Sequence, residues 1–394
     1  MLNTPFSPWP SFTQEEADAV SRVLLSNKVN YWTGSECREF EREFAAWAGT
    51  SHAIALANGT LALDVILKAL GVGPGDDVVV TSRTFLASAS CIVTAGATPV
   101  FADVDADSQN ITADSVRAVL TPRTRAIIAV HLAGAPCDMD PLMALAAERG
   151  LFVIEDCAQA HGARYKGRSV GSIGHAGAWS FCQDKIMTTG GEGGMVTTND
   201  RELWSRMWSY KDHGKSWEAV YERQHPPGFR WVHDSFGTNW RMMEMQAVIG
   251  RIQLRRMAEW TAARTRNAEA VLSAARSCEA LRVPVACGSA DIHAHYKAYV
   301  FVRPERLAEG WSRDRIMAEI AAAGVPCYSG SCSEVYLEKA FDNTGWRPAE
   351  RLPVARELGE TSLMFLVHPT LTPAEVERTC AVLVEVMRRA ARPA

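Results

Sequence analysis

The stretch Trp179-Ser-Phe-Cys-Gln-Asp-Lys185-Ile-Met-Thr-Thr-Gly-Gly-Glu-Gly-Gly194 places a single lysine shortly before a glycine-rich turn. An apolar run over residues 151–155 precedes this stretch and ends at Asp156. A buried amine that condenses with an aldehyde and a carboxylate that keeps a ring nitrogen protonated are the two protein groups that a pyridoxal phosphate enzyme needs most. Lys185 and Asp156 together therefore indicate an enzyme that uses pyridoxal 5'-phosphate.

Short apolar runs alternate with helical segments on both sides of this stretch. The runs are typical of buried strands, and several helical segments end at a glycine, such as Gly71, Gly96 or Gly150. The predicted strands are residues 53–57, 77–81, 99–102, 126–131, 151–155, 177–181 and 195–198, and the predicted helices are 61–70, 87–95, 113–120, 141–148 and 201–211. This alternation predicts an α/β fold with a large, mostly parallel sheet that has helices on both faces.

The rest of the chain is expected to form a second, smaller domain, because 394 residues are too many for one simple core. A long helix is predicted over about 242–264, followed by a strand over 297–302, a helix over 312–323 and a last helix opened by Thr372-Pro373. We therefore expect a large α/β domain over residues 1–250 and a C-terminal α+β domain over 251–394. The polar and aromatic segment 216–234 is predicted to be a loop over a site or an interface.

Composition excludes several classes of partner. The formal net charge of −4 gives no basic field for a phosphodiester backbone, so we expect no nucleic acid partner. The ten cysteines form no C-x-x-C pair, and neither a signal peptide nor an apolar stretch of ~18 residues occurs, which predicts a cytoplasmic protein with reduced thiols and no membrane anchor. His293-Ala-His295 lacks a third ligand, so no metal site is predicted.

A phosphate site is also indicated. Asn58-Gly59-Thr60 follows a predicted strand and opens a helix, where backbone N–H groups, a hydroxyl and the positive end of the helix dipole favour a phosphate. Ser180 offers a second hydroxyl, and Phe85 offers a ring that stacks on an aromatic cofactor. Each of these residues also has an ordinary structural interpretation, as a capped helix start, a strand serine or a core phenylalanine.

The motifs resemble the DegT/DnrJ/EryC1/StrS group of pyridoxal-phosphate-dependent sugar aminotransferases, within the fold type I aspartate aminotransferase superfamily. The resemblance runs along nearly the whole chain. The matching motifs are Trp32-Thr-Gly34, Phe40-Glu-Arg-Glu-Phe44, Asn58-Gly-Thr60, Thr84-Phe85, Gly96-Ala-Thr-Pro-Val-Phe101, Glu155-Asp-Cys-Ala-Gln-Ala-His-Gly-Ala163, Ser180-Phe181, Gly191-Glu-Gly-Gly194 and Gly237-Thr-Asn-Trp-Arg241.

The resemblance implies a role for each matched residue. Lys185 would bind the cofactor covalently and carry a proton, and Asp156 would pair with the pyridinium nitrogen. Phe85 would lie against the cofactor ring, and Gln159 would contact its 3-oxygen side. The residues implied to hold the phosphate are Gly59, Thr60 and Ser180.

The resemblance also implies a homodimer with shared active sites, since Asn239 would reach the phosphate of the neighbouring subunit. Trp32 and Tyr328 are expected to contact the substrate. The segment Cys327-Tyr-Ser-Gly-Ser-Cys332, where many relatives have histidine or aromatic residues, is interpreted either as a substrate-specific loop or as a turn of small residues.

The implied activity is transfer of an amino group from an amino acid such as L-glutamate to a keto group of a nucleotide-linked deoxy-sugar. The form Thr188-Thr-Gly-Gly-Glu-Gly-Gly194 resembles enzymes that aminate C4 more than those that act at C3, which more often carry Gly-Asp-Gly-Gly. A C3 keto-sugar or keto-inositol aminotransferase and a non-catalytic pyridoxal-phosphate-binding sensor remain alternatives. The lysine at position 185 disfavours a sugar deoxygenase, which has histidine there.

Overall fold

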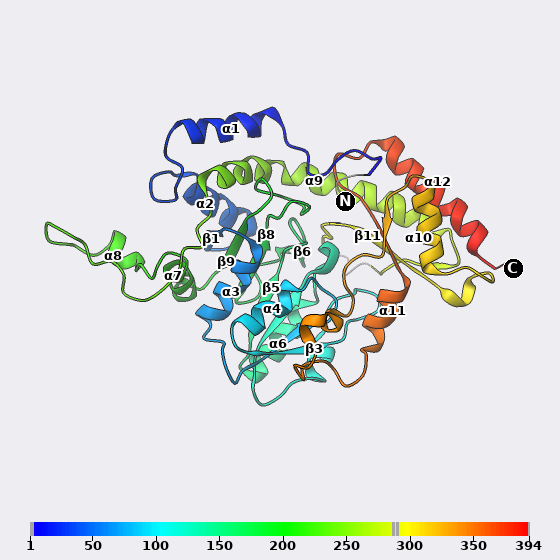
Figure 1. Ribbon diagram of the computed structural model, residues 1–394, viewed down its shortest axis with the longest axis horizontal. Helices are drawn as coiled ribbons and strands as arrows, with labels where there is room; N and C mark the ends of the chain where they lie inside the picture. The colour runs from blue at the N-terminus through cyan, green and yellow to red at the C-terminus, as the bar shows by residue number, and fades with distance from the viewer. Residues whose placement is uncertain (1–3, 286–287, 289–290, 393–394) are drawn as a thin grey trace.

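The computed structural model describes residues 4–285, 288 and 291–392, and its centre is a seven-stranded sheet in the order β1-β9-β8-β5-β4-β2-β3 (Figure 1). The strands are β1 (His52–Leu56), β2 (Asp77–Thr81), β3 (Thr98–Ala102), β4 (Thr124–Val130), β5 (Phe152–Asp156), β8 (Ala176–Ser180) and β9 (Gly194–Thr198). Neighbouring strands from β3 to β8 are parallel, whereas β9 is antiparallel to both β8 and β1. The predicted mostly parallel sheet is confirmed, with strand ends within two residues of the predicted ones.

Helices cover both faces of this sheet because successive residues of a strand point to opposite sides. Ile54 and Ile128 pack on one face with residues of α3 (Gly59–Ala69), α4 (Ala87–Thr94) and α7 (Arg201–Tyr210). Their chain neighbours Ala55 and Ile127 face the other side, where α2 (Glu36–Ala48), α5 (Ala113–Arg117) and α6 (Met139–Arg149) pack. Apolar residues at both odd and even positions are therefore buried, which is why these strands read as continuous apolar runs.

The long helix α9 (Glu244–Arg276) joins the two parts of the molecule and runs across the upper half of Figure 1, below α1. Its first half packs with α1 (Gln14–Leu25) and α2, and its second half packs with β11 (Ala298–Val302) and α12 (Pro373–Ala390). The predicted helix over 242–264 is thus twelve residues too short at its end. The predicted domain boundary at residue 250 falls inside this helix and stays a prediction.

The C-terminal part is built on an antiparallel sheet in the order β10-β11-β13-β12, as an α+β arrangement requires. Its remaining strands are β10 (Leu281–Arg282), β12 (Cys327–Tyr328) and β13 (Ser362–Phe365), with α10 (Arg313–Ala322) and α11 (Pro353–Thr361) beside them. A short hairpin of β6 (Arg164–Tyr165) and β7 (Arg168–Ser169) completes the strands. None of the helices in the described residues is long and apolar enough to cross a membrane.

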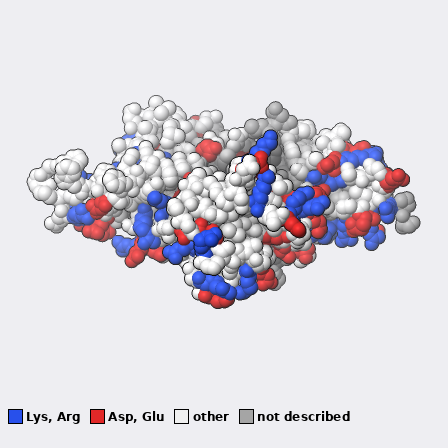
Figure 2. All heavy atoms as spheres, turned by 60° about the horizontal axis from the view of Figure 1, so that its bottom comes forward, with Lys and Arg blue, Asp and Glu red and all other residues white. Residues whose placement is uncertain are grey.

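The segment 216–234 and its short helix α8 (Trp217–Tyr221) form an arm that extends from the body at the left of Figure 1. The arm and the residues after it expose large apolar side chains, namely Phe229 (75%), Trp231 (79%) and Phe236 (99%). Figure 2 shows positive and negative residues interspersed over the face it draws. The described cysteines are free thiols, and Cys287 lies outside the described residues.

Candidate active site

A cavity of about 900 Å³ lies at the carboxyl ends of β5 and β8, the edge where α/β sheets bind ligands. The structure brings together seven of the predicted site residues around it, namely Gly59, Thr60, Phe85, Asp156, Gln159, Ser180 and Lys185. Trp32, Tyr328 and Asn239 do not line this cavity. Within the described chain, Trp32 packs against Trp208 and beneath the ammonium group of Lys215, so its expected contact with a substrate stays a prediction.

Lys185 lies on the turn after β8, half-buried at the cavity wall. Its Nζ is 5.2 Å from the centroid of the Tyr296 ring, and its backbone oxygen accepts a 2.8 Å hydrogen bond from Trp9 Nε1. Gly190 and Gly191 follow at φ values of +86° and +116°, which only glycine adopts readily. The doubled glycine therefore lets the chain reverse and pair β9 with β8.

Asp184, next to the lysine, accepts a 2.5 Å hydrogen bond from the Tyr296 hydroxyl. Burial raises the pKa of this carboxyl group, but the positive charge of Lys185, the Tyr296 hydroxyl and the charge of Lys297 outweigh that effect and lower its pKa below the ordinary value. Asp184 is therefore a carboxylate that faces both lysines of the cavity.

Asp156 ends β5 and points toward α4, because even-numbered residues of this strand face that side of the sheet. Ser88 of α4 donates a 2.7 Å hydrogen bond to Asp156 Oδ2, and Thr84 Oγ1 lies 2.8 Å from the same serine hydroxyl. Because the Ser88 proton is already used, Thr84 is the donor of the second bond. The backbone N–H of Ala158 donates to Oδ1 at 3.1 Å, so both oxygens of Asp156 are held in position.

Glu155 precedes Asp156 and therefore points to the opposite face, away from the cavity. It is fully buried and accepts hydrogen bonds from the backbone N–H groups of Gly171, Ile173 and Gly174 at 2.8, 2.8 and 2.6 Å. Burial raises the pKa of Glu155, but the hydrogen bond with His131 and those from the Gly174 and Gly171 N–H groups outweigh burial, so the pKa of Glu155 lies below its ordinary value. Glu155 and Asp156 are adjacent in the chain, yet backbone N–H groups surround the first carboxylate, whereas the second lies at the cavity.

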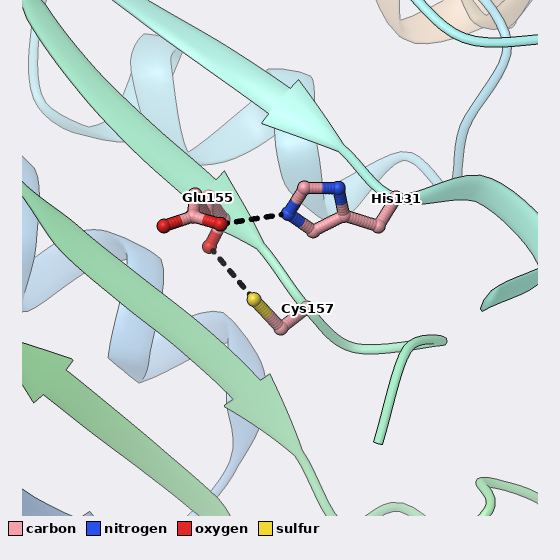
Figure 3. A group of neighbouring side chains, drawn as sticks. All are labelled: His131, Glu155 and Cys157. Carbon is pink, nitrogen blue, oxygen red and sulfur yellow. Dashed lines mark hydrogen bonds and ion pairs between the residues drawn. The ribbon is translucent and has the colours of Figure 1, made fainter. Parts of the chain in front are cut away.

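His131 lies beside Glu155 at the end of β4, and Figure 3 shows the pair with Cys157. The Cys137 backbone N–H donates to His131 Nδ1 at 3.0 Å, so Nε2 carries the ring proton and donates it to Glu155 Oε2, also at 3.0 Å. The His131, Glu155 and Cys157 ligand atoms lie within 4.8 Å of one another, a spacing that suits a metal ion. Both imidazole nitrogens and both carboxylate oxygens already have protein partners, so the network ties β4, β5 and the loop 171–174 together.

The phosphate end of the predicted site is the start of α3. Asn58 Oδ1 caps this helix by accepting a 3.0 Å hydrogen bond from the Leu61 N–H, which leaves the first N–H groups of the helix directed at the cavity. A Cβ atom on Gly59 would lie 2.6 Å from Ser180 Cβ, so glycine is required for the close approach of α3 to β8. Phe85 extends into the cavity with 67% of its surface exposed, unusual for a phenylalanine that serves only as core.

Gln159 follows Asp156 on the loop after β5. Its side-chain oxygen accepts a 2.8 Å hydrogen bond from the Ala133 backbone N–H, so the amide NH₂ group is what it offers to the cavity.

The C-terminal part contributes residues that the motifs did not single out. Tyr296, Lys297 and Tyr299 line the cavity from the start of β11, and Gly330, Ser331 and Cys332 line it from the loop after β12. The unusual composition of 327–332 was the one sequence signal for this wall, although Tyr328 itself is half-buried against the core and does not line the cavity, so its expected contact with a substrate stays a prediction. Tyr296 and Lys297 lie far from every cofactor motif in the chain, and no sequence pattern marked them.

The model of the DegT/DnrJ/EryC1/StrS aminotransferase family matches residues 10–384. The chain belongs to this family. The resemblance found in the motifs is thus confirmed, and the protein is a sugar aminotransferase of the DegT/DnrJ/EryC1/StrS group.

Three relatives of this aminotransferase cover nearly its whole length. A GDP-perosamine synthase of Caulobacter vibrioides is 38% identical over 89% of this chain and 89% of its own. A dTDP-3-amino-3,4,6-trideoxy-alpha-D-glucose transaminase of Streptomyces venezuelae is 36% identical over 94% and 92%. The X-ray structure of an aminotransferase from Psychrobacter cryohalolentis superposes with a TM-score of 0.96 at 67% identity, over 98% of this chain and 99% of that one. The shared fold confirms the predicted α/β architecture.

Proposed function

We propose that this aminotransferase uses pyridoxal 5'-phosphate to move an amino group from L-glutamate to the C4 keto group of a nucleotide-linked deoxy-sugar. The observation that carries this proposal is the placement of Lys185 and Asp156 on one cavity with the N-terminus of α3. When bound, the cofactor supplies an electron sink for the carbon that gains or loses the amino group.

Two side chains perform the acid–base work in this proposal. Lys185 would hold the cofactor through its Nζ, and its amine would move a proton to and from the reacting carbon. Asp156 would keep a proton on the ring nitrogen. The Thr84 to Ser88 to Asp156 chain of hydrogen bonds supports that role, because it fixes the carboxylate orientation before any ligand arrives.

The remaining residues bind and orient. The N–H groups at the start of α3 and the hydroxyls of Thr60 and Ser180 hold the phosphate. Phe85 would lie against the cofactor ring, and the Gln159 NH₂ group would donate to the ring oxygen. The exposed Phe85 ring and the occupied Gln159 oxygen support these assignments.

The sugar substrate is inferred from the relatives and from one motif. The two curated relatives are named for products built on different nucleotides, GDP and dTDP, so a nucleotide-linked sugar is the common class. Amination at C4 is favoured by the form Thr188-Thr-Gly-Gly-Glu-Gly-Gly194. Incubation with L-glutamate and 4-keto or 3-keto sugars linked to GDP, dTDP or UDP, followed by NMR of the product, identifies the carbon; amination of 3-keto sugars alone would contradict the C4 assignment.

We also propose that two copies of the chain share their active sites. The exposed Phe229, Trp231 and Phe236 favour burial of the arm against a second copy, and Asn239 is free to serve a neighbour's cavity because it does not line its own. Mixing inactive Lys185→Ala and Asn239→Ala subunits tests this proposal. Mixed dimers have one intact site each, so activity returns to about a quarter of the wild-type value; no recovery on mixing contradicts site sharing.

The cofactor role of Lys185 has a direct spectroscopic test. The wild type is expected to show the visible band of the lysine-bound cofactor and to lose it on addition of L-glutamate. Lys185→Ala should lack this band and turn over no substrate, whereas Lys28→Ala, which removes an exposed lysine, should behave as the wild type. A wild-type band that glutamate leaves unchanged would exclude L-glutamate as the donor.

A further inference from the structure

A second lysine lines the cavity, although the proposed chemistry uses one. Lys297 immediately precedes β11, and only 6% of its surface is exposed. Its Nζ is 4.6 Å from the centroid of the Tyr296 ring, the same ring that lies 5.2 Å from Lys185 Nζ. Both ammonium groups therefore lie over the same aromatic ring, each within 5.2 Å of its centroid.

A buried arginine adds to this positive charge. Arg264 of α9 is 1% exposed, and its Nη1 donates to the backbone oxygen of Tyr296 at 3.3 Å. Its Nε and Nη2 atoms have no hydrogen-bond partner among the described residues. Among the described residues, the charges that act on Lys297 are those of Asp184, Arg264 and Lys185, although Asp156, Glu192 and Glu338 also line the cavity. Beside Tyr296, Lys297 and Arg264 outnumber Asp184 even when Lys185 is used as the covalent amine, which leaves a local surplus of positive charge. Such a surplus in a buried site favours an anionic ligand.

The chemistry of the donor identifies that anion. An α-amino acid carries a carboxylate on the same carbon as its amine, and that amine must reach the position of Lys185 Nζ. The carboxylate therefore enters the cavity close to Lys185, and it remains on the oxo acid that leaves. Lys185 and Lys297 are the cationic side chains among the described residues that line the cavity, and Lys185 is already used as the covalent amine.

We infer that Lys297 binds the carboxylate of the amino-acid donor, with Arg264 behind it as a second positive charge. This inference rests on the proposed aminotransferase function, but it is independent of which keto-sugar accepts the amino group. The ammonium group holds the carboxylate in place while Lys185 moves the proton.

An unreactive dicarboxylate separates binding from turnover. Glutarate has the carboxylates of L-glutamate without its amine, so its affinity for the cofactor-loaded enzyme is measurable by calorimetry. Lys297→Gln is expected to weaken glutarate binding about 10- to 100-fold and to raise the KM for L-glutamate similarly, with a smaller change in kcat, because a charge-assisted hydrogen bond is lost. Lys297→Arg should restore most of the affinity, and Lys28→Gln should leave it unchanged.

A pH profile gives a signature that a purely structural lysine would not produce. Burial and the nearby positive charges of Arg264 and Lys185 lower the pKa of Lys297 to about 8, although the negative charge of Asp184 acts in the opposite direction. Glutarate affinity in the wild type should therefore fall as the pH rises through about 8, because the ammonium group is lost there. Lys297→Arg should remove that decline. Within the described part of the chain, the titratable and charged groups that face Lys297 include Asp184, Lys185, Arg264, Tyr296 and His368.

Unchanged glutarate affinity in Lys297→Gln overturns the inference. A loss of affinity in Lys297→Gln that Lys297→Arg fails to restore also overturns it, provided that both variants keep the wild-type thermal midpoint. If the wild type binds glutarate through Lys297 yet aminates no keto-sugar, the proposed acceptor fails and the carboxylate site stands. If Lys297→Gln aminates the keto-sugar with an unaltered KM for L-glutamate, the carboxylate site fails and the proposed function stands.

Discussion

Replacement of Glu155 by glutamine tests the network behind the cofactor site with a change of almost no volume. In the wild type, Oε1 accepts from the Ile173 and Gly174 N–H groups, and Oε2 accepts from the Gly171 N–H and His131 Nε2. A glutamine side chain replaces one of these oxygens by an NH₂ group. Either orientation of the amide therefore turns a donor toward two other donors.

The expected loss follows from those two unsatisfied donors. A buried N–H group that loses its acceptor costs about 1–3 kcal/mol, so the Glu155→Gln variant should lose about 2–6 kcal/mol of unfolding free energy. The loss also depends on pH. Because the folded-state pKa of Glu155 is lowered, its stabilising contribution is fully present above its ordinary value of 4.5 and is lost as the pH falls through the folded pKa. The difference in unfolding free energy between the wild type and the Glu155→Gln variant should therefore be smaller in acid.

Urea denaturation followed by circular dichroism at pH 7 and at pH 4 measures both effects. Glu148→Gln is the matched control, because Glu148 pairs with Arg149 on the exposed surface, where loss of an ion pair changes stability little. A Glu155→Gln variant that loses less than about 1 kcal/mol at pH 7 would refute the view that the three N–H groups depend on this carboxylate.

Two further substitutions test the cofactor side of the sheet. Gly59→Ala would bring a Cβ to 2.6 Å from Ser180 Cβ, so it should lower the unfolding free energy by about 1–3 kcal/mol and weaken cofactor retention. Gly73→Ala is the matched control, because its Cβ would meet nothing nearer than 3.7 Å, and it should keep the wild-type melting temperature. Ser88→Ala removes the 2.7 Å hydrogen bond to Asp156 and should weaken cofactor binding about 10-fold in an absorbance titration; an affinity within twofold of the wild type would contradict the orienting role.

The sequence was sufficient for the large domain because its signals are local. Strand predictions succeeded where apolar runs of about five residues lie between helices that end at a glycine. Both faces of a parallel sheet are buried, so nearly every residue of such a strand is apolar. The end of α9 was missed because its second half is stabilised by β11 and α12, which are distant in the chain. Tertiary packing, rather than the local pattern, sets that helix end.

The candidate site divides in the same way. Lys185, Asp156 and Gly59 were identifiable because each lies in a motif whose neighbours carry the same chemistry. Ser88 was not, and Thr84 was matched only as part of the motif Thr84-Phe85 without a role, because this chain of two hydroxyls reaches Asp156 only when β5 is placed beside α4.

The sequence by itself determined the fold class and the family of this protein, because those features reside in short-range patterns and in ordered motifs, and it predicted Lys185 as the covalent lysine. Only the tertiary structure decided that adjacent carboxylates serve different purposes. Glu155 and Asp156 are neighbouring acidic residues, but side chains alternate along β5. Glu155 therefore points toward backbone N–H groups, whereas Asp156 points toward the cavity. It likewise brought Lys297 beside Lys185, because a position at the start of β11 reaches that cavity wall only after the two parts of the molecule have packed along α9.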